Sequence, residues 1–137
     1  MENNVFAVID TNVLVSALLS KDLNANTIQV IKAIIDMRIT PIYNDEIFQE
    51  YEDVLSRDKF HFTEENIINF LSIFKSNGIN VNRTKVEEEI FPDPKDIVFY
   101  EVAMSKEDAF LVTGNIKHFP TKPFVVTPAQ MMAILNQ

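Results

Sequence analysis

Short apolar runs alternate along the chain with amphipathic stretches. Residues 5–9 (VFAVI) form an unbroken apolar run rich in β-branched residues, which predicts a strand buried on both faces, as in parallel sheets. Four more runs predict short strands, at residues 39–43, 79–82, 109–113 and 124–127. Pro41 indicates that the second strand is irregular or lies at an edge of the sheet.

Apolar residues between these strands recur at helical spacing. Helices are expected at residues 13–20, 24–38, 44–57, 63–77, 92–105 and 128–135. Asn12 or Thr11 is expected to cap the first helix, and Gly78 to end the fourth. Strands that alternate with helices predict an α/β fold, with a parallel sheet covered on both sides.

Composition is that of one globular domain over residues 1–137, because 47% of the residues are apolar and 23% are charged. The chain has no Cys, which excludes disulfides, thiolate zinc sites, iron–sulfur clusters and a Cys nucleophile. The two His, at positions 61 and 118, are too far apart for an H-E-x-x-H zinc site, and two Gly are too few for a glycine-rich phosphate loop. We expect a cytoplasmic protein with no signal peptide and no transmembrane helix.

The formal net charge of −8 limits the partners of the protein. A polyanion such as RNA is repelled by the average field of an acidic domain. A carboxylate cluster that holds a divalent metal would cancel this repulsion locally.

Polar residues stand at the expected ends of two strands. Asp10 follows the first strand and Asn115 follows the fourth. If the strand order is 3-2-1-4-5, these strands are neighbours where the order reverses, which is where open parallel sheets bind ligands. Asp93 and Asp96 open the helix that leads to the fourth strand. An N-cap at Asp93 and a dipole interaction at Asp96 would explain both acids without any function.

The expected helix over residues 44–57 carries several acids, most of which must face solvent. Glu50 lies at the border of the apolar stripe beside Ile47 and Val54. Glu52 has a similar position beside Phe48 and Leu55, and the helical wheel does not choose between them.

Other residue types give weaker signals. The two histidines, His61 and His118, are expected to be surface or capping groups. Lys117, His118 and Lys122 form the nearest approach to a basic cluster beside the expected site. The phenylalanines of the middle region are expected to contact the core or a partner rather than to stack on bases: Phe60, Phe62, Phe70 and Phe74.

Four ordered segments resemble the motifs of the PIN-domain family: VIDTNV (8–13), EIFQEYEDVL (46–55), DPKD (93–96) and LVTGN (111–115). They span almost the whole chain, and HFP (118–120) follows the last of them. The likeness is closest to the branch that contains toxins of toxin–antitoxin pairs. The resemblance implies a three-layer α/β/α fold with strand order 3-2-1-4-5 and Mg²⁺- or Mn²⁺-dependent cleavage of single-stranded RNA.

The resemblance also implies roles for particular residues. The three metal-binding and catalytic acids match Asp10, Glu50 and Asp96, with Asp93 a neighbouring alternative to the third. The fourth acidic position of the family is Asn115 here. An amide oxygen can still bind a hard cation but brings no charge, so a second metal ion would be held less firmly.

Three further residues match positions that support the site in the family. Asn12 and Thr113 match polar supporting residues, and Ser16 matches a small polar position on the first helix. The resemblance implies an antitoxin protein as partner, and the Phe-rich helices around residues 60–75 are compatible with a homodimer.

Two rival hypotheses remain. The fold could persist as a binding or scaffold domain whose catalytic site has decayed. A receiver-type phosphoacceptor domain also has an acidic pocket on a parallel sheet, and Lys122-Pro123 resembles its Lys-Pro pair. The expected third strand, however, is followed by Asn82-Arg83-Thr84, which offers no phosphoacceptor Asp.

Overall fold

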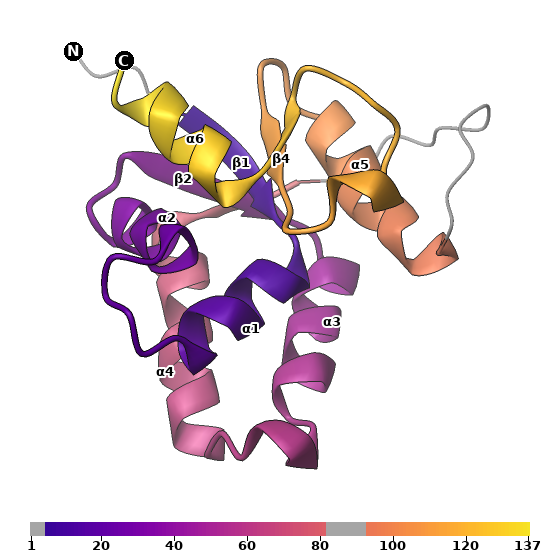
Figure 1. Ribbon diagram of the computed structural model, residues 1–137. Helices are drawn as coiled ribbons and strands as arrows, with labels where there is room; N and C mark the ends of the chain where they lie inside the picture. The colour runs from indigo at the N-terminus through magenta and orange to yellow at the C-terminus, as the bar shows by residue number, and fades with distance from the viewer. Residues whose placement is uncertain (1–4, 82–92) are drawn as a thin grey trace.

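A parallel five-stranded sheet with the order β3-β2-β1-β4-β5 forms the centre of the protein. This arrangement is seen in a computed structural model, which describes residues 5–81 and 93–137 (Figure 1). The predicted fold class and strand order are therefore confirmed. The strands are β1 (Val5–Ile9), β2 (Ile39–Tyr43), β3 (Ile79–Asn80), β4 (Phe110–Val112) and β5 (Val125–Val126).

Helices cover both faces of this sheet (Figure 1). The α-helices are α1 (Thr11–Leu19), α2 (Asn26–Ile35), α3 (Asp45–Leu55), α4 (Glu64–Asn77), α5 (Ile97–Met104) and α6 (Pro128–Leu135). Helix α5 packs across β1, β2 and β4 on one side, and α2 packs against α6, α4 and β2 on the other. Three short 3₁₀ turns complete the described elements: η1 (Asp58–Phe60), η2 (Pro94–Asp96) and η3 (Ile116–His118).

Strand β1 is the middle strand, and its last three residues are fully buried. In register, Ile9 lies opposite Val112 of β4, and the backbone N–H of Asp10 donates to the carbonyl of Val112 at 2.9 Å. The chain thus leaves the sheet beside the end of β4 and enters α1 at once. The carboxyl end of β1 opens toward the part of the molecule that contains α1, α3 and α4 (Figure 1).

Several expected element boundaries differ from the structure. Helix α1 is capped by Asp10 rather than by Asn12 or Thr11, although the Asp10 side chain makes no capping hydrogen bond. Helix α2 ends at Ile35, because Met37 takes a left-handed conformation with φ 63° that no helix continues through. The fifth predicted helix starts as the turn η2, and its expected first residue, Pro92, lies outside the described residues.

Pro41 does not mark an edge of the sheet, because β2 pairs with β1 on one side and with β3 on the other. Gly78 ends α4 as predicted, but its φ of −112° does not require glycine. A Cβ at Gly78 would lie 2.5 Å from the carbonyl oxygens of Phe74 and Pro41. The glycine is therefore needed because α4 and β2 approach each other closely there.

Candidate active site

Asp10 lies at the centre of the sheet edge and is only 7% exposed. Its carboxylate oxygen Oδ2 accepts a hydrogen bond of 2.8 Å from the hydroxyl of Thr113, which follows β4. The same hydroxyl accepts a hydrogen bond of 2.9 Å from the backbone N–H of Asn115. Thr113 thus fixes the orientation of Asp10 and links it to the turn after β4.

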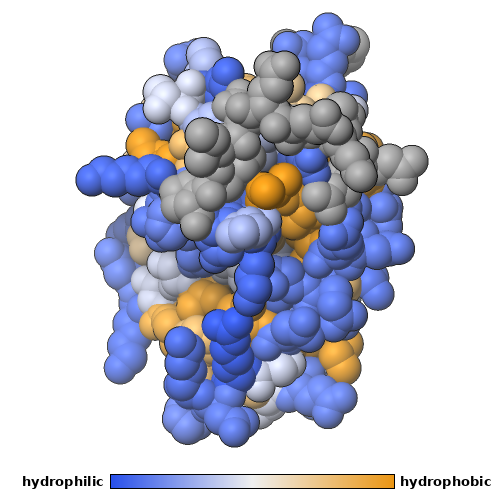
Figure 2. Space-filling view, turned by 90° about the vertical axis from the view of Figure 1, so that its right-hand side faces the viewer, coloured by the Kyte–Doolittle hydropathy of each residue, from blue (hydrophilic) through white to orange (hydrophobic). Residues whose placement is uncertain are grey.

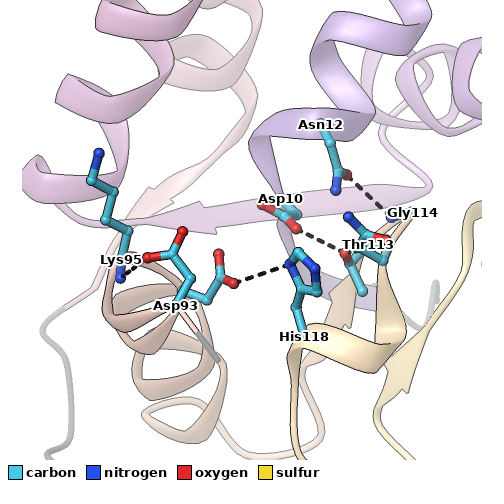
Figure 3. Close-up of polar contacts among 9 residues, drawn as sticks. Asp10, Asn12, Asp93, Lys95, Thr113, Gly114 and His118 are labelled. Carbon is cyan, nitrogen blue, oxygen red and sulfur yellow. Dashed lines mark hydrogen bonds and ion pairs between the residues drawn. The ribbon is translucent and has the colours of Figure 1, made fainter. Parts of the chain in front are cut away.

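A second contact joins the same two segments of the chain. The side-chain oxygen of Asn12 accepts a hydrogen bond of 3.1 Å from the backbone N–H of Gly114. Figure 3 shows the pairs Asp10–Thr113 and Asn12–Gly114 side by side, between the start of α1 and the loop after β4. The start of α1 and this loop are therefore held together by two side chains that lie on either side of Thr11.

Asp96 approaches the site from η2, at the start of α5. Its oxygen Oδ2 lies 3.5 Å from Nδ1 of His118, which belongs to η3. This distance is longer than an ordinary N–H···O hydrogen bond, so the contact is an ion pair when His118 is protonated. Within the described part of the chain, the same buried oxygen has no hydrogen-bond partner. A buried carboxylate oxygen without a donor favours the binding of a cation or a proton.

The electrostatics of the two aspartates reflect their proximity. The pKa of Asp10 is raised from 3.8 to about 6, chiefly by burial and also by the charge of Asp96, while the Thr113 hydrogen bond and His118 oppose the rise. Burial also raises the pKa of Asp96, and so do the charges of Asp93 and Glu50, while His118 lowers it. Carboxylates that disfavour one another's charge are stabilised by a bound cation.

Glu50 and Glu52 lie on different sides of α3. Glu50 is half-buried and close enough to Asp96 to raise the pKa of that carboxyl. Glu52 is exposed and lines a separate pocket, together with Tyr43 and Lys75. Of the two glutamates that the helical wheel left open, the structure brings Glu50 toward the aspartates.

The remaining predicted residues surround this centre at greater distance. Asp93 is exposed, and its side chain accepts a hydrogen bond of 3.0 Å from the backbone N–H of Lys95, so it caps η2 as the structural interpretation expected. Asn115 is exposed at the start of η3. Ser16 is also exposed, and its hydroxyl donates to the hydroxyl of Thr27 at 3.3 Å.

Two residues in the site were undervalued or missed at the sequence level. His118 was expected to be a surface or capping group, but it faces Asp96 (Figure 3). Tyr51 is completely buried, and its hydroxyl donates to the carbonyl of Ile9 at 2.5 Å, directly before Asp10. Both residues belong to segments that resemble the family motifs, E-Y at 50–51 and H-F-P at 118–120. This resemblance was the sequence feature that could have indicated their place in the site.

The donor set suits a hard divalent cation. The acids Asp10, Asp96 and Glu50 offer oxygen, which Mg²⁺ and Mn²⁺ prefer. Within residues 5–81 and 93–137, no group of three acidic or histidine side chains is arranged to enclose an ion. Mg²⁺ is commonly held by only one or two carboxylates and keeps several waters, so Asp10 and Asp96 together fit it.

The helices of the described segments include none with the length and apolar character to cross a bilayer. No individually curated protein matches the sequence at a significant level. The sequence profile of the PIN domain matches residues 7–117, a segment that includes Asp10, Glu50, Asp96 and Asn115. Proteins with this domain are generally nucleases and typically use divalent metals. The chain therefore belongs to the PIN domain family.

Proposed function

We propose that this protein is a divalent-metal-dependent endoribonuclease that cleaves single-stranded RNA. The observation that carries the proposal is the pairing of two acids from distant parts of the chain. Asp10 is buried at the end of the middle strand, and Asp96 presents beside it a buried oxygen without a hydrogen-bond donor. In a PIN domain, such a pair supports a role for Asp10, Asp96 and Glu50 in holding Mg²⁺ or Mn²⁺.

A divalent cation bound there would neutralise the scissile phosphate and lower the pKa of an attacking water. The protein's own groups have separate tasks. Asp10, held by Thr113, would be the central metal ligand. Asp96 and Glu50 would be further ligands or would orient the attacking water, and Asn115 would position metal-bound water or the phosphate. The expected products carry 5′-phosphate and 3′-hydroxyl ends.

His118 supplies the positive charge nearest to the paired acids in the described part of the chain when it is protonated. Its position beside Asp96 favours the anionic form of that carboxylate, because a nearby cation lowers the pKa of an acid, and it opposes part of the rise that burial and the charge of Asp93 cause. Lys117 lies next to it in η3 and extends the positive charge along the loop. The positive charge of this loop would attract the phosphates of an RNA strand locally, although the net charge of −8 repels them overall.

The direct test is cleavage of a labelled single-stranded RNA with Mn²⁺, Mg²⁺ or EDTA. Wild-type protein should cleave with either metal and not with EDTA, and Asp10→Asn should lose the activity. Asp36→Asn is the matched control, since Asp36 is exposed at the end of α2. Equal cleavage by wild type and Asp10→Asn would remove Asp10 from the mechanism, and cleavage in EDTA would remove the metal.

A toxin role within a toxin–antitoxin pair is the biological part of this proposal. It is supported by the resemblance of the motifs at residues 8–13 and 111–115 to the toxin branch of the family. Expression of wild-type protein should arrest growth, and expression of Asp10→Asn should not. Co-expression of the product of an adjacent gene should restore growth and inhibit RNA cleavage by the purified protein.

A decayed PIN domain that only binds a partner is the second candidate. It is favoured by Asn115 at the fourth acidic position, and by the absence of a three-acid enclosure among the described residues. Thermal unfolding distinguishes the two candidates, because a ligand that binds only the folded protein raises its melting temperature. A shift with millimolar Mn²⁺ that is lost in Asp10→Asn supports the nuclease, and no shift supports the decayed domain.

A further inference from the structure

The peptide group that joins Ile9 to Asp10 is held from two sides. The backbone N–H of Asp10 donates to the carbonyl of Val112 at 2.9 Å, and the carbonyl of Ile9 accepts the hydrogen bond of 2.5 Å from the hydroxyl of Tyr51. The N–H and the C=O of one trans peptide group lie in a single plane and point in opposite directions. Strand β4 therefore fixes one edge of this group, and α3 fixes the other.

These two backbone contacts add to the hydrogen bond that Thr113 donates to the carboxylate of Asp10. Thr113 orients the side chain, whereas the backbone contacts determine where the Cα atom of Asp10 lies. Tyr51, which supplies one of them, directly follows Glu50 in the chain. One hydrogen bond thus connects the backbone in front of Asp10 with the helix that carries Glu50, across 42 positions of the chain.

The ring of Tyr51 is held at this contact because it is completely buried among other aromatic rings. Its centroid lies 5.5 Å from that of Phe74 in α4, at an interplanar angle of 62°, and 6.4 Å from that of Phe99 in α5. Phe99 lies in the first turn of α5, the helix that begins directly after Asp96. Tyr51 therefore links the three segments that carry the proposed acids: the end of β1, helix α3 and the start of α5.

Packing alone accounts for the ring of Tyr51 but not for its hydroxyl. Helix α3 buries four residues, and the other three are wholly apolar: Ile47, Val54 and Leu55. The exposed residues of α3 are polar, and Figure 2, which views the molecule from the side of α3 and α5, shows mainly hydrophilic side chains. A phenylalanine would fill the space of the buried ring without the cost of burying a hydroxyl. The hydrogen bond to Ile9 offsets that cost and is the specific contribution of the hydroxyl.

We propose that Tyr51 is a positioning residue of the metal site, whose hydroxyl sets the separation between Asp10 and Glu50. The inference rests on the proposed metal-dependent nuclease function and deepens it, because it adds a completely buried residue that acts only through the ligands. Mg²⁺ demands near-ideal octahedral geometry, so its affinity depends on how precisely the carboxylates are placed. Partners that orient metal ligands typically change metal affinity or activity by about 10- to 100-fold when they are removed.

The test measures metal binding to Tyr51→Phe in the absence of RNA. This substitution keeps the ring and removes the donor to the Ile9 carbonyl. Isothermal titration calorimetry should show that the Kd for Mn²⁺ rises on the order of tenfold relative to wild type. In RNA cleavage, the Mn²⁺ concentration that gives the half-maximal rate should rise by a similar factor. The KM for RNA at saturating Mn²⁺ should not change, because a completely buried side chain cannot touch the substrate.

Two further variants separate positioning from a general loss of stability. Ile34→Val removes one methyl group from a fully buried residue of α2, and it should lower the melting temperature by a few degrees, as Tyr51→Phe should. Only Tyr51→Phe should weaken Mn²⁺ binding. Replacement of Tyr51 by para-aminophenylalanine returns an N–H donor to the same place and should recover Mn²⁺ affinity.

Several results would overturn the inference. Wild-type Mn²⁺ affinity in Tyr51→Phe is one, equal weakening in Tyr51→Phe and Ile34→Val is another, and no recovery with para-aminophenylalanine is a third. If Tyr51→Phe does not fold, Phe99→Leu takes its place. This variant loosens the contact between Tyr51 and α5 and should also raise the Kd for Mn²⁺, so an unchanged Kd would overturn the inference as well.

Metal binding without RNA distinguishes this inference from the proposed function. If Tyr51→Phe cleaves RNA at the same Mn²⁺ concentrations as wild type, the positioning role is wrong and the nuclease stands. If wild type binds Mn²⁺ but cleaves no RNA, while Tyr51→Phe binds Mn²⁺ about tenfold more weakly, the nuclease proposal fails and the positioning role remains. No Mn²⁺ binding by wild type would overturn both.

Discussion

The substitution Asp10→Asn should stabilise the metal-free protein at neutral pH while removing its activity. Burial gives the folded protein an Asp10 pKa of about 6, against 3.8 for the unfolded chain. The folded state therefore binds more protons than the unfolded state between these values, and its stability falls as pH rises from about 4 to about 6. Above that range, Asp10 is ionised in both states, and the fold bears the full free-energy cost of burying the charged carboxylate.

The magnitude follows from the shift of about two pKa units. At about 1.36 kcal/mol per unit, ionised Asp10 costs about 3 kcal/mol at pH 7. Asn is nearly isosteric and neutral, and its side-chain oxygen can still accept the Thr113 hydrogen bond. For a domain of this size, the gain corresponds to a rise in melting temperature of roughly 10 °C. At pH 4 the gain should fall below about 1 kcal/mol, because the carboxyl is then protonated in the folded protein.

Differential scanning fluorimetry in EDTA at several pH values checks this expectation, with Asp36→Asn as the exposed control. Addition of Mn²⁺ should raise the melting temperature of wild type and leave that of Asp10→Asn nearly unchanged. A gain that does not depend on pH would show that the charge of Asp10 is not its cause. A melting temperature below that of wild type at pH 7 would refute the reasoning altogether.

The other predictions concern single contacts. Glu50→Gln should lower RNA cleavage on the order of tenfold or more, while Glu52→Gln should leave it unchanged, because only Glu50 interacts with Asp96; steady-state kinetics of both variants measures this. If both substitutions abolish cleavage, the assignment of Glu50 rather than Glu52 as the catalytic glutamate is wrong. His118→Ala should raise the pKa of the Asp96 carboxyl, as followed by NMR titration, and an unchanged value would contradict the ion pair. Gly78→Ala should destabilise the protein by about 1–3 kcal/mol in urea unfolding, since its Cβ would meet two carbonyl oxygens, and a neutral result would contradict the close approach of α4 and β2.

Hydrophobic patterning was sufficient to predict the sheet and most of its helices. The last three residues of the run at 5–9 are fully buried, as expected for a central parallel strand, while Val5 and Phe6 are half-buried. Strands β3 and β5 are two residues long, shorter than the predicted ranges 79–82 and 124–127, and residue 82 lies outside the described residues. The end of α2 depends on the backbone conformation of Met37, which no pattern of polarity records.

The site was only partly predictable. Asp10 and Asn115 could be placed at the sheet edge, because strand ends in a parallel sheet share that edge. The choice between Glu50 and Glu52 needed the rotation of α3, and the position of His118 needed the path of the turn η3, both of which depend on tertiary packing. The depression that Thr11, Val54 and Phe60 line could not be predicted, since it forms only through the packing of α1 against α3.

The hydrogen bond between Thr113 and Asp10 joins residues that are 103 positions apart in the chain. During translation, Thr113 and strand β4 leave the ribosome long after Asp10. Pairing over such a separation is slow relative to local folding. The orientation of Asp10 therefore depends on closure of the sheet between β1 and β4, and the local folding of β1 and α1 does not supply it.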